Sequence, residues 1–216
     1  MWRGLRQHGR RAPRSRTRHD DAMSGTAGHP FARLERIANG PAGLALVGTW
    51  AFAEAIFFPI IPDVAIGLLA LVAPRRAVPL FLVLVAGALA GTAVLYWWTL
   101  LAPGAVHSML LALPGIHEST IIAARETVAG GNPLSIALVG PGTPLKVYTF
   151  AWATGPATPV ALAVGAVLNR ITRIGPVLLL LAALGWLAPG FLRRHGRLTL
   201  AVYASAYVAL YAIYWS

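Results

Sequence analysis

The sequence predicts an all-α integral membrane protein. We expect an inverted repeat of a re-entrant helical hairpin plus a transmembrane helix, with an additional C-terminal transmembrane helix. The chain of 216 residues is 57% hydrophobic and only 12% charged, whereas a soluble domain carries roughly 25% charged residues. Two of its apolar segments are interrupted by a Pro-x-x-Pro run, and the basic residues gather in a few clusters between apolar segments.

The N-terminal region, residues 1–36, holds nine arginines against three acids and has no apolar run. It is therefore not a secretory signal peptide. Basic segments of this kind bind anionic lipid or nucleic acid, or remain disordered. We expect a disordered tail with no nucleic-acid partner, and Met23 offers an alternative start. Residues 37–216 are then expected to form a single transmembrane domain.

The first broken segment covers about residues 41–74. A spanning helix needs about 20 apolar residues, but the run Pro59-Ile-Ile-Pro62-Asp63 interrupts this segment shortly after Glu54. The apolar stretch after the break is too short to cross. We interpret the segment as a re-entrant hairpin, because irregular backbone at membrane depth is tolerated only where protein or a wet cavity satisfies its polar groups.

The second broken segment, about residues 133–156, repeats this pattern. Its break is the run Gly140-Pro141-Gly142-Thr143-Pro144. Lys146, the only lysine of the chain, follows this break by two residues. Neither arm is long enough to cross a membrane, so a second re-entrant hairpin is predicted. A polar loop with one amphipathic helix, about 117–129, is expected to precede it.

Three further segments are apolar enough to span a membrane: about 78–101, 158–188 and 198–215. The pair Gly175-Pro176 predicts a kink in the second of them.

Orientation follows from the excess of Lys and Arg that cytoplasmic loops carry. If both broken segments are re-entrant, every basic cluster falls on the side of the N-terminal tail. Those clusters are the pair Arg75 and Arg76 and the group Arg193, Arg194 and Arg197. We therefore expect a cytoplasmic N-terminus and an outside C-terminus. The strong preference for arginine over lysine, with abundant Ala and Gly, favours the inner membrane of a bacterium.

Five ionisable residues fall at similar predicted depth in the two halves: Glu54, Asp63, Lys146, Arg170 and Arg173. Arg170 lies about 12 residues into its span, about 18 Å at 1.5 Å per residue, which is near the middle of a hydrocarbon core about 30 Å thick. Ionisable groups at that depth are costly and mark functional sites by default.

The three bases, Lys146, Arg170 and Arg173, are predicted to hold an anionic head group, because arginine suits bidentate contact with phosphate. The two acids, Glu54 and Asp63, are predicted to take up protons and so to couple transport to a proton gradient. The alternative is that the five residues only pair with one another and hold the hairpins together.

Several other classes of site find no support in the sequence. The chain has no cysteine, so it has no thiol nucleophile and no cysteine metal site. His107 and His117 lie ten residues apart in the polar loop with no matching ligand. No Gly-x-Ser-x-Gly nucleophile elbow is present. We expect no catalytic residues, no metal and no cofactor.

Three runs resemble the signatures of a known family. The run Phe52-Ala-Glu54-Ala-Ile-Phe-Phe-Pro59-Ile-Ile-Pro62-Asp63-Val resembles the first signature of the DedA family, also called VTT-domain or SNARE-associated Golgi protein-like membrane proteins. The run Gly140-Pro-Gly-Thr-Pro144-Leu-Lys146-Val-Tyr-Thr-Phe is similar to the second signature, in the small branch that has Pro-x-x-Lys-Val-aromatic. Leu168-Asn169-Arg170-Ile-Thr-Arg173 resembles that branch's Gly-Arg-Gly-x-Arg-Phe element. Ile61, Asn169 and Ile174 depart from the pattern.

The resemblance covers about residues 40–188. It implies two facing re-entrant hairpins and a flippase or scramblase that moves lipids between leaflets in dependence on the proton gradient. The lipid implied is an anionic or zwitterionic phospholipid, or a polyprenyl phosphate such as undecaprenyl phosphate. The matching acidic positions are Glu54 and Asp63, and the basic ones are Lys146, Arg170 and Arg173. A non-catalytic membrane factor that organises lipids or partner proteins remains the alternative.

Overall fold

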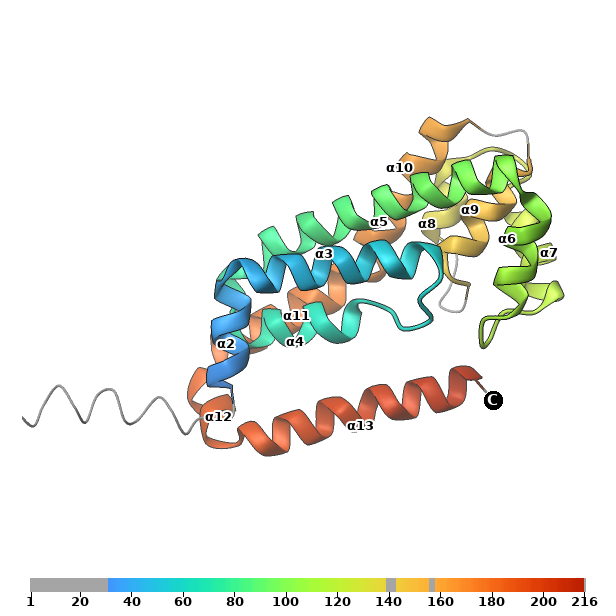
Figure 1. The fold of residues 1–216 in the computed structure, drawn as a ribbon. Coiled ribbons are helices and arrows are strands. Elements are labelled where there is room, and N and C mark those ends of the chain that lie inside the picture. Colours follow the sequence, from blue (N-terminus) through green and yellow to red (C-terminus); the bar gives the residue numbers. More distant parts are fainter. Residues whose placement is uncertain (1–30, 139–142, 156–157, 216) are drawn as a thin grey trace, which may run out of the picture.

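The computed structural model describes residues 31–138, 143–155 and 158–215, and within these ranges the chain is helical without any strand. The prediction of an all-α protein is confirmed. Figure 1 shows that the longer helices run along one axis, with shorter helices lying across it at both ends. In chain order they are α2 (Ala32–Asn39), α3 (Pro41–Ile56), α4 (Asp63–Val72), the 3₁₀ turn η1 (Pro74–Arg76), α5 (Ala77–Leu101), α6 (Pro103–Leu111), α7 (Glu118–Val128), α8 (Pro133–Leu138), α9 (Leu145–Ala153), α10 (Pro159–Arg173), α11 (Gly175–Leu187), α12 (Pro189–Arg194) and α13 (Gly196–Trp215).

Prolines define many of the helix boundaries. A proline occupies the first position of α3, η1, α6, α8, α10 and α12, and the second position of α11. Proline is already shaped for the first turn of a helix, and it lacks the N–H group that would be unpaired there. The local sequence therefore sets where these helices begin, before any tertiary contact forms.

Three helical segments are long and apolar enough to cross a membrane: Pro74–Leu101, Pro159–Leu187 and Gly196–Ile213. They coincide with the three predicted spans and indicate a membrane-embedded protein. The second segment is divided at Ile174 into α10 and α11, beside the Gly175-Pro176 pair where the sequence predicts a kink.

The first broken segment is a pair of antiparallel helices. α3 has 16 residues and α4 has 10, which correspond to about 24 Å and 15 Å at 1.5 Å per residue, whereas a bilayer core is about 30 Å thick. Figure 1 shows α4 running back along α3 after the loop that joins them. The indole N–H of Trp50 donates to the carbonyl oxygen of Ile60 at 2.9 Å and so fastens this loop to α3.

The second broken segment contributes α8, of six residues, and α9, of nine. The predicted break residues Gly140, Pro141 and Gly142 lie outside the described residues. α5 packs against both α3 and α9, while α10 packs on α8 and α11 on α4. Each of these two long segments thus contacts both broken pairs.

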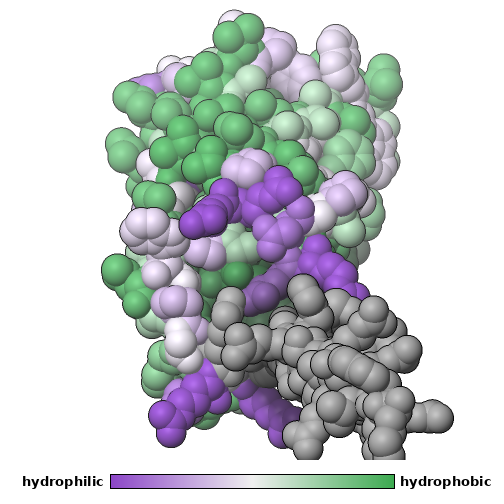
Figure 2. Space-filling model, turned by 90° about the vertical axis from the view of Figure 1, so that its left-hand side faces the viewer, coloured by the Kyte–Doolittle hydropathy of each residue, from purple (hydrophilic) through white to green (hydrophobic). Residues whose placement is uncertain are grey.

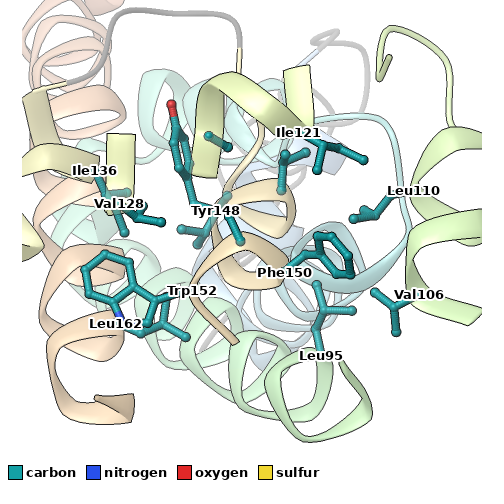
Figure 3. Close-up of a cluster of buried hydrophobic side chains, with 14 of the residues drawn as sticks. Leu95, Val106, Leu110, Ile121, Val128, Ile136, Tyr148, Phe150, Trp152 and Leu162 are labelled. Atoms are coloured by element: carbon teal, nitrogen blue, oxygen red, sulfur yellow. The ribbon is translucent and has the colours of Figure 1, made fainter. Parts of the chain in front are cut away.

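The buried side chains form two hydrophobic clusters. One gathers α3, α4, the first half of α5 and α11. The other surrounds α9, where Tyr148, Phe150 and Trp152 pack against α5, α6, α7, α8 and α10, and Figure 3 shows these rings projecting from α9 into the cluster. The two clusters lie on either side of the region where α3 ends and α9 begins.

Most of the described surface arginines gather at one end of the molecule. α2, η1 and α12 lie together at that end, and α6 and α7 lie at the other (Figure 1). The basic end is seen face-on in Figure 2, where hydrophilic residues gather beside hydrophobic ones. Its described arginine side chains are Arg33, Arg36, Arg75, Arg76, Arg194 and Arg197.

Two boundaries differ from the sequence-based expectation. Residues 32–36, assigned to the tail, belong to α2, because Phe31 and Ala38 are buried where α2 packs on α3 and α4. The loop before the second broken segment contains a further helix, α6, because Val106 and Leu110 are fully buried in the cluster around α9. The amphipathic helix predicted at 117–129 is present as α7.

Close contact between α3 and α5 gives the first testable prediction. A Cβ atom added at Gly87 would lie 2.3 Å from the carbonyl oxygen of Gly48. Gly87→Ala should therefore force the two backbones apart and lower the free energy of unfolding by about 1–3 kcal/mol, as overpacking does. Thermal unfolding in detergent would measure it. Gly104→Ala is the matched control, since an added Cβ there meets nothing within 4 Å. Equal melting temperatures for the two variants would contradict the packing argument.

Candidate functional site

The centre of the site is one carboxylate bound by two bases. Glu54 lies in the last turn of α3 and is 1% exposed. Arg170, in the last turn of α10, donates from Nη2 to Glu54 Oε2. Lys146, in the first turn of α9, places Nζ 3.9 Å from Glu54 Oε1. The structure thus brings together three of the five predicted site residues, from the two halves of the chain.

All three side chains of this cluster are almost completely buried, at 1–2% exposure. Two positive charges against one negative leave the cluster with an excess of positive charge. Lys146 Nζ also donates to the carbonyl oxygen of Phe58 at 2.9 Å, in the break after α3. Arg170 Nε is buried without a hydrogen-bond partner among the described residues. Buried charges need both pairing and hydrogen bonds, and this cluster satisfies that need only in part.

Asp63 is the second predicted acid. It lies close enough to Glu54, Arg170 and Arg173 to interact with them electrostatically, but it makes no direct ion pair with a described base. It begins α4, directly after Pro62, where the positive end of the helix dipole favours a carboxylate. It is 9% exposed, and its Oδ1 has no hydrogen-bond partner in the described part of the chain. No described Lys or Arg nitrogen lies within 4.0 Å of its carboxylate. Asp63 is therefore a nearly buried carboxyl group whose charge no direct ion pair neutralises.

Arg173 lies one turn beyond Arg170 and is half-buried. Its Nη1 donates to the carbonyl oxygen of Thr143 across a long 3.5 Å contact. Its guanidinium group is not ion-paired with any described acid. Of the three predicted bases, Arg173 is thus the one that reaches towards the surface.

The broken ends of the short helices are completed by side chains from elsewhere. Asn169 donates from Nδ2 to the carbonyl oxygen of Ile136 at 3.0 Å, and Thr172 donates to that of Ala137 at 2.9 Å. Both acceptors lie in the last turns of α8, where helical carbonyl groups lack partners within the helix. Pro144 precedes α9 in an extended conformation, and Pro59 and Pro62 lie in the loop before α4. These contacts explain how irregular backbone is accommodated beside the cluster.

One part of the site was not foreseen: a row of tyrosines on α13. Tyr203, Tyr207 and Tyr211 are spaced four residues apart and share one face. The Tyr203 hydroxyl lies 3.2 Å from the carbonyl oxygen of Asp63 and 3.0 Å from that of Val64, to which it donates.

The same row contacts the break itself, since the backbone N–H of Ile61 donates to the Tyr211 hydroxyl at 2.7 Å. Most other residues of α13 are exposed, so this tyrosine face is what joins the helix to the first broken segment. The four-residue spacing of tyrosines in an apolar span was the available signal.

No group of three or more His, Cys, Asp or Glu side chains in the described ranges is arranged to hold a metal ion. The chemistry that the residues offer is binding of an anion by arginine and lysine, and exchange of protons by two buried carboxyl groups.

Comparisons of the chain with family models, with curated proteins and with solved structures find no match. The function is therefore inferred from the site itself.

The central cluster predicts a large effect of removing its carboxylate. Glu54→Gln leaves Lys146 and Arg170 buried together without an anion, and breaking a buried pair typically costs about 3–5 kcal/mol. Chemical unfolding in detergent would measure the loss. Glu118→Gln is the matched control, because Glu118 pairs at 3.1 Å with His107 on the surface, where such pairs contribute about 0–1 kcal/mol. Similar losses in both variants would contradict the central role of Glu54.

The tyrosine row makes a separate prediction about the first break. Removing the Tyr211 hydroxyl takes away the partner of the Ile61 N–H, and one hydrogen bond contributes about 1 kcal/mol, or about a fivefold change in loop opening. The chain has no cysteine, so a single Ile60→Cys reports opening through its rate of maleimide labelling. Tyr211→Phe should raise that rate about fivefold, whereas Tyr96→Phe, on α5, should leave it unchanged. An unchanged rate in Tyr211→Phe would show that this contact does not hold the loop.

Proposed function

We propose that this protein moves phosphate-bearing lipids between the two leaflets of a bacterial cytoplasmic membrane, as its resemblance to the DedA family implies. The observation that carries the proposal is the buried cluster in which Lys146 and Arg170 from the second half share Glu54 from the first. Broken helices that place ionisable groups together between two halves are typical of transporters.

In this proposal both broken pairs are re-entrant hairpins, related by inverted topology. Neither α3 nor α4 is long enough to cross a bilayer, and α8 and α9 are shorter still. The basic end formed by α2, η1 and α12 then faces the cytoplasm, in keeping with the rule for positive charges. The opposite end, with α6, α7 and the C-terminus, lies outside.

The cluster suggests how head-group binding and proton uptake are linked. A lipid phosphate and the Glu54 carboxylate need the same two cations, so they compete for Lys146 and Arg170. When Glu54 takes up a proton, both bases lose their anion and become available to a phosphate group. Asp63, which has no ion-pair partner among the residues that the structure describes, is the second proton acceptor in this scheme. Proton uptake would therefore favour the lipid-bound state.

Arg173 offers the first contact to an approaching head group. It is half-buried, and its one hydrogen bond within the described part of the chain is a long contact to the carbonyl oxygen of Thr143. It lies one helical turn beyond the completely buried Arg170, so a phosphate passing inwards would meet first Arg173 and then Arg170. Zwitterionic and anionic phospholipids and polyprenyl phosphates all carry the phosphate that this pair would recognise.

An apolar groove beside the cluster suits a lipid chain. A hollow of about 470 Å³ runs along α3, and small residues form its floor at Ala45, Thr49 and Ala53. Trp50 and Phe58 form its walls, with their rings in edge contact at 5.8 Å between centroids. Phe58 is also the residue whose carbonyl oxygen binds Lys146. One residue that lines the groove thus also contacts the cluster, which suits an amphiphile with a charged head.

A second function, a non-catalytic membrane factor that organises lipids or partner proteins, is favoured by a different observation. Glu54 is already bound by Arg170, and Lys146 already has the Phe58 carbonyl oxygen, without any ligand. In that case the cluster would serve only to join α3, α9 and α10.

A charge-balanced variant separates the two functions. Lys146→Met leaves Glu54 and Arg170 as a matched pair, so the protein should fold, yet it removes the cation that the head group needs. In liposomes, exchange of head-group-labelled phospholipid between leaflets should fall at least about tenfold, because a charge-assisted hydrogen bond contributes about 1.5–3 kcal/mol. Arg125→Gln, on the surface of α7, is the control and should retain exchange.

The outcomes are distinct. Exchange by the wild type that is lost only in Lys146→Met supports a carrier with its site at the second broken segment. Equal exchange in both variants would remove the cluster from the transport path. If the wild type exchanges neither phospholipid nor polyprenyl phosphate, the carrier proposal fails and the organising factor takes its place.

A further inference from the structure

A second pocket lies at the basic end of the molecule, away from the central cluster. It has a volume of about 450 Å³ and is formed where α2, η1, α11 and α12 meet the end of α4. That volume falls within the range of about 300–1,000 Å³ that is usual for small-molecule sites. Figure 2 views the molecule from this end.

The inner wall of the pocket is backbone and apolar side chain. α11 crosses α4 so closely that a Cβ atom at Gly185 would lie 2.1 Å from the carbonyl oxygen of Leu71. The backbone of α4 therefore excludes any side chain at position 185. Leu71, Leu192 and the largely exposed ring of Trp186 supply apolar contact area around it. Tryptophan is enriched where a membrane meets water, so the pocket is placed for an amphiphile rather than for a wholly polar ligand.

The polar part of the lining consists of Glu35, Asn39 and Arg75. Arg75 is exposed, and no described acid lies within ion-pair distance of it. Its neighbour Arg76 is already committed, since it donates from Nη2 to the carbonyl oxygen of Asn39. Arg75 is therefore the cation in the pocket that is available to a ligand.

The charge around the pocket selects an anion. Six arginine side chains are described at this end, at positions 33, 36, 75, 76, 194 and 197, against the single acid Glu35. Guanidinium groups bind phosphate with two parallel hydrogen bonds, and basic pockets between helices at the cytoplasmic face are typical sites for anionic lipid head groups. The Glu35 carboxylate adds an acceptor for a hydroxyl group on the same head.

We propose that this pocket binds the head group of an anionic, hydroxyl-bearing glycerophospholipid, such as phosphatidylglycerol, with the phosphate on Arg75 and an acyl chain against Trp186 and Leu192. The site is separate from the central cluster, and the bound lipid is a resident of the protein rather than its cargo. The bound lipid would contact α2, η1 and α12 together. It would thereby stabilise the packing of these short helices at the basic end of the molecule.

Native mass spectrometry of the full chain, released from phosphatidylcholine nanodiscs that contain phosphatidylglycerol, tests the proposal. Arg75→Gln should weaken retention of phosphatidylglycerol about tenfold, because one charge-assisted contact to phosphate is lost. Arg36→Gln is the matched control: it removes an arginine from the same end that does not line the pocket, and it should change retention less than about twofold. Equal losses in both variants would mean that the positive charge of this end attracts anionic lipid without a specific site, and would overturn the proposal.

A pair of variants that change side-chain volume tests the same site without altering its charge. Leu192→Trp fills the pocket and should abolish retention, whereas Phe191→Trp changes the adjacent residue, which does not line the pocket and is 59% exposed. Retention in Leu192→Trp equal to that of the wild type would place the lipid elsewhere.

Competition by free glycerol phosphate distinguishes a lipid head group from a soluble phosphate compound as the ligand of the pocket. Binding of free glycerol phosphate with the same affinity as the lipid would show that the acyl chain contributes nothing, and would overturn a lipid as the occupant.

Discussion

The contact on which the rest of this structure depends is the one between Glu54 and its two bases. A single carboxylate at the end of α3 binds Arg170 at the end of α10 and Lys146 at the start of α9. Each of these helices ends or begins at a break, where backbone groups lose their helical partners. Because unpaired charge is expensive in an apolar setting, the three helix ends are held at one point. The two hydrophobic clusters then form on either side of it.

The polar contacts near the cluster serve the same need. Asn169 and Thr172 bind carbonyl groups at the end of α8, Trp50 binds the carbonyl oxygen of Ile60, and Tyr211 accepts the N–H of Ile61. In a lipid environment, apolar burial between helices contributes little, and hydrogen bonds and close packing decide how helices associate. The molecule therefore has an exposed apolar surface and an interior in which polar side chains complete the backbone.

The sequence predicts much of this arrangement because its signals are local. Apolar length marks the three long segments, and proline marks where helices begin. The meeting of Glu54, Lys146 and Arg170 follows from placing two breaks at one depth. Which residues pair within the cluster cannot be predicted in this way, because a shared depth does not determine which acid each base contacts. Glu54 pairs with both Lys146 and Arg170, whereas Asp63 has no described base within ion-pair distance. The tyrosine face of α13 and the pocket beside Arg75 need the tertiary packing of helices distant in sequence.

The separation of Glu54 and Arg170 in the sequence has a consequence for how the protein is assembled during synthesis. Arg170 follows Glu54 by 116 residues, and at about 5–20 residues per second a ribosome needs on the order of ten seconds to reach it. During that interval α3 and α4 exist without the bases that neutralise Glu54. The first broken segment therefore completes its ion pairs only after most of the chain has been made. Its contacts with α11 and with the tyrosines of α13 form later still, so the two halves of the fold are completed together.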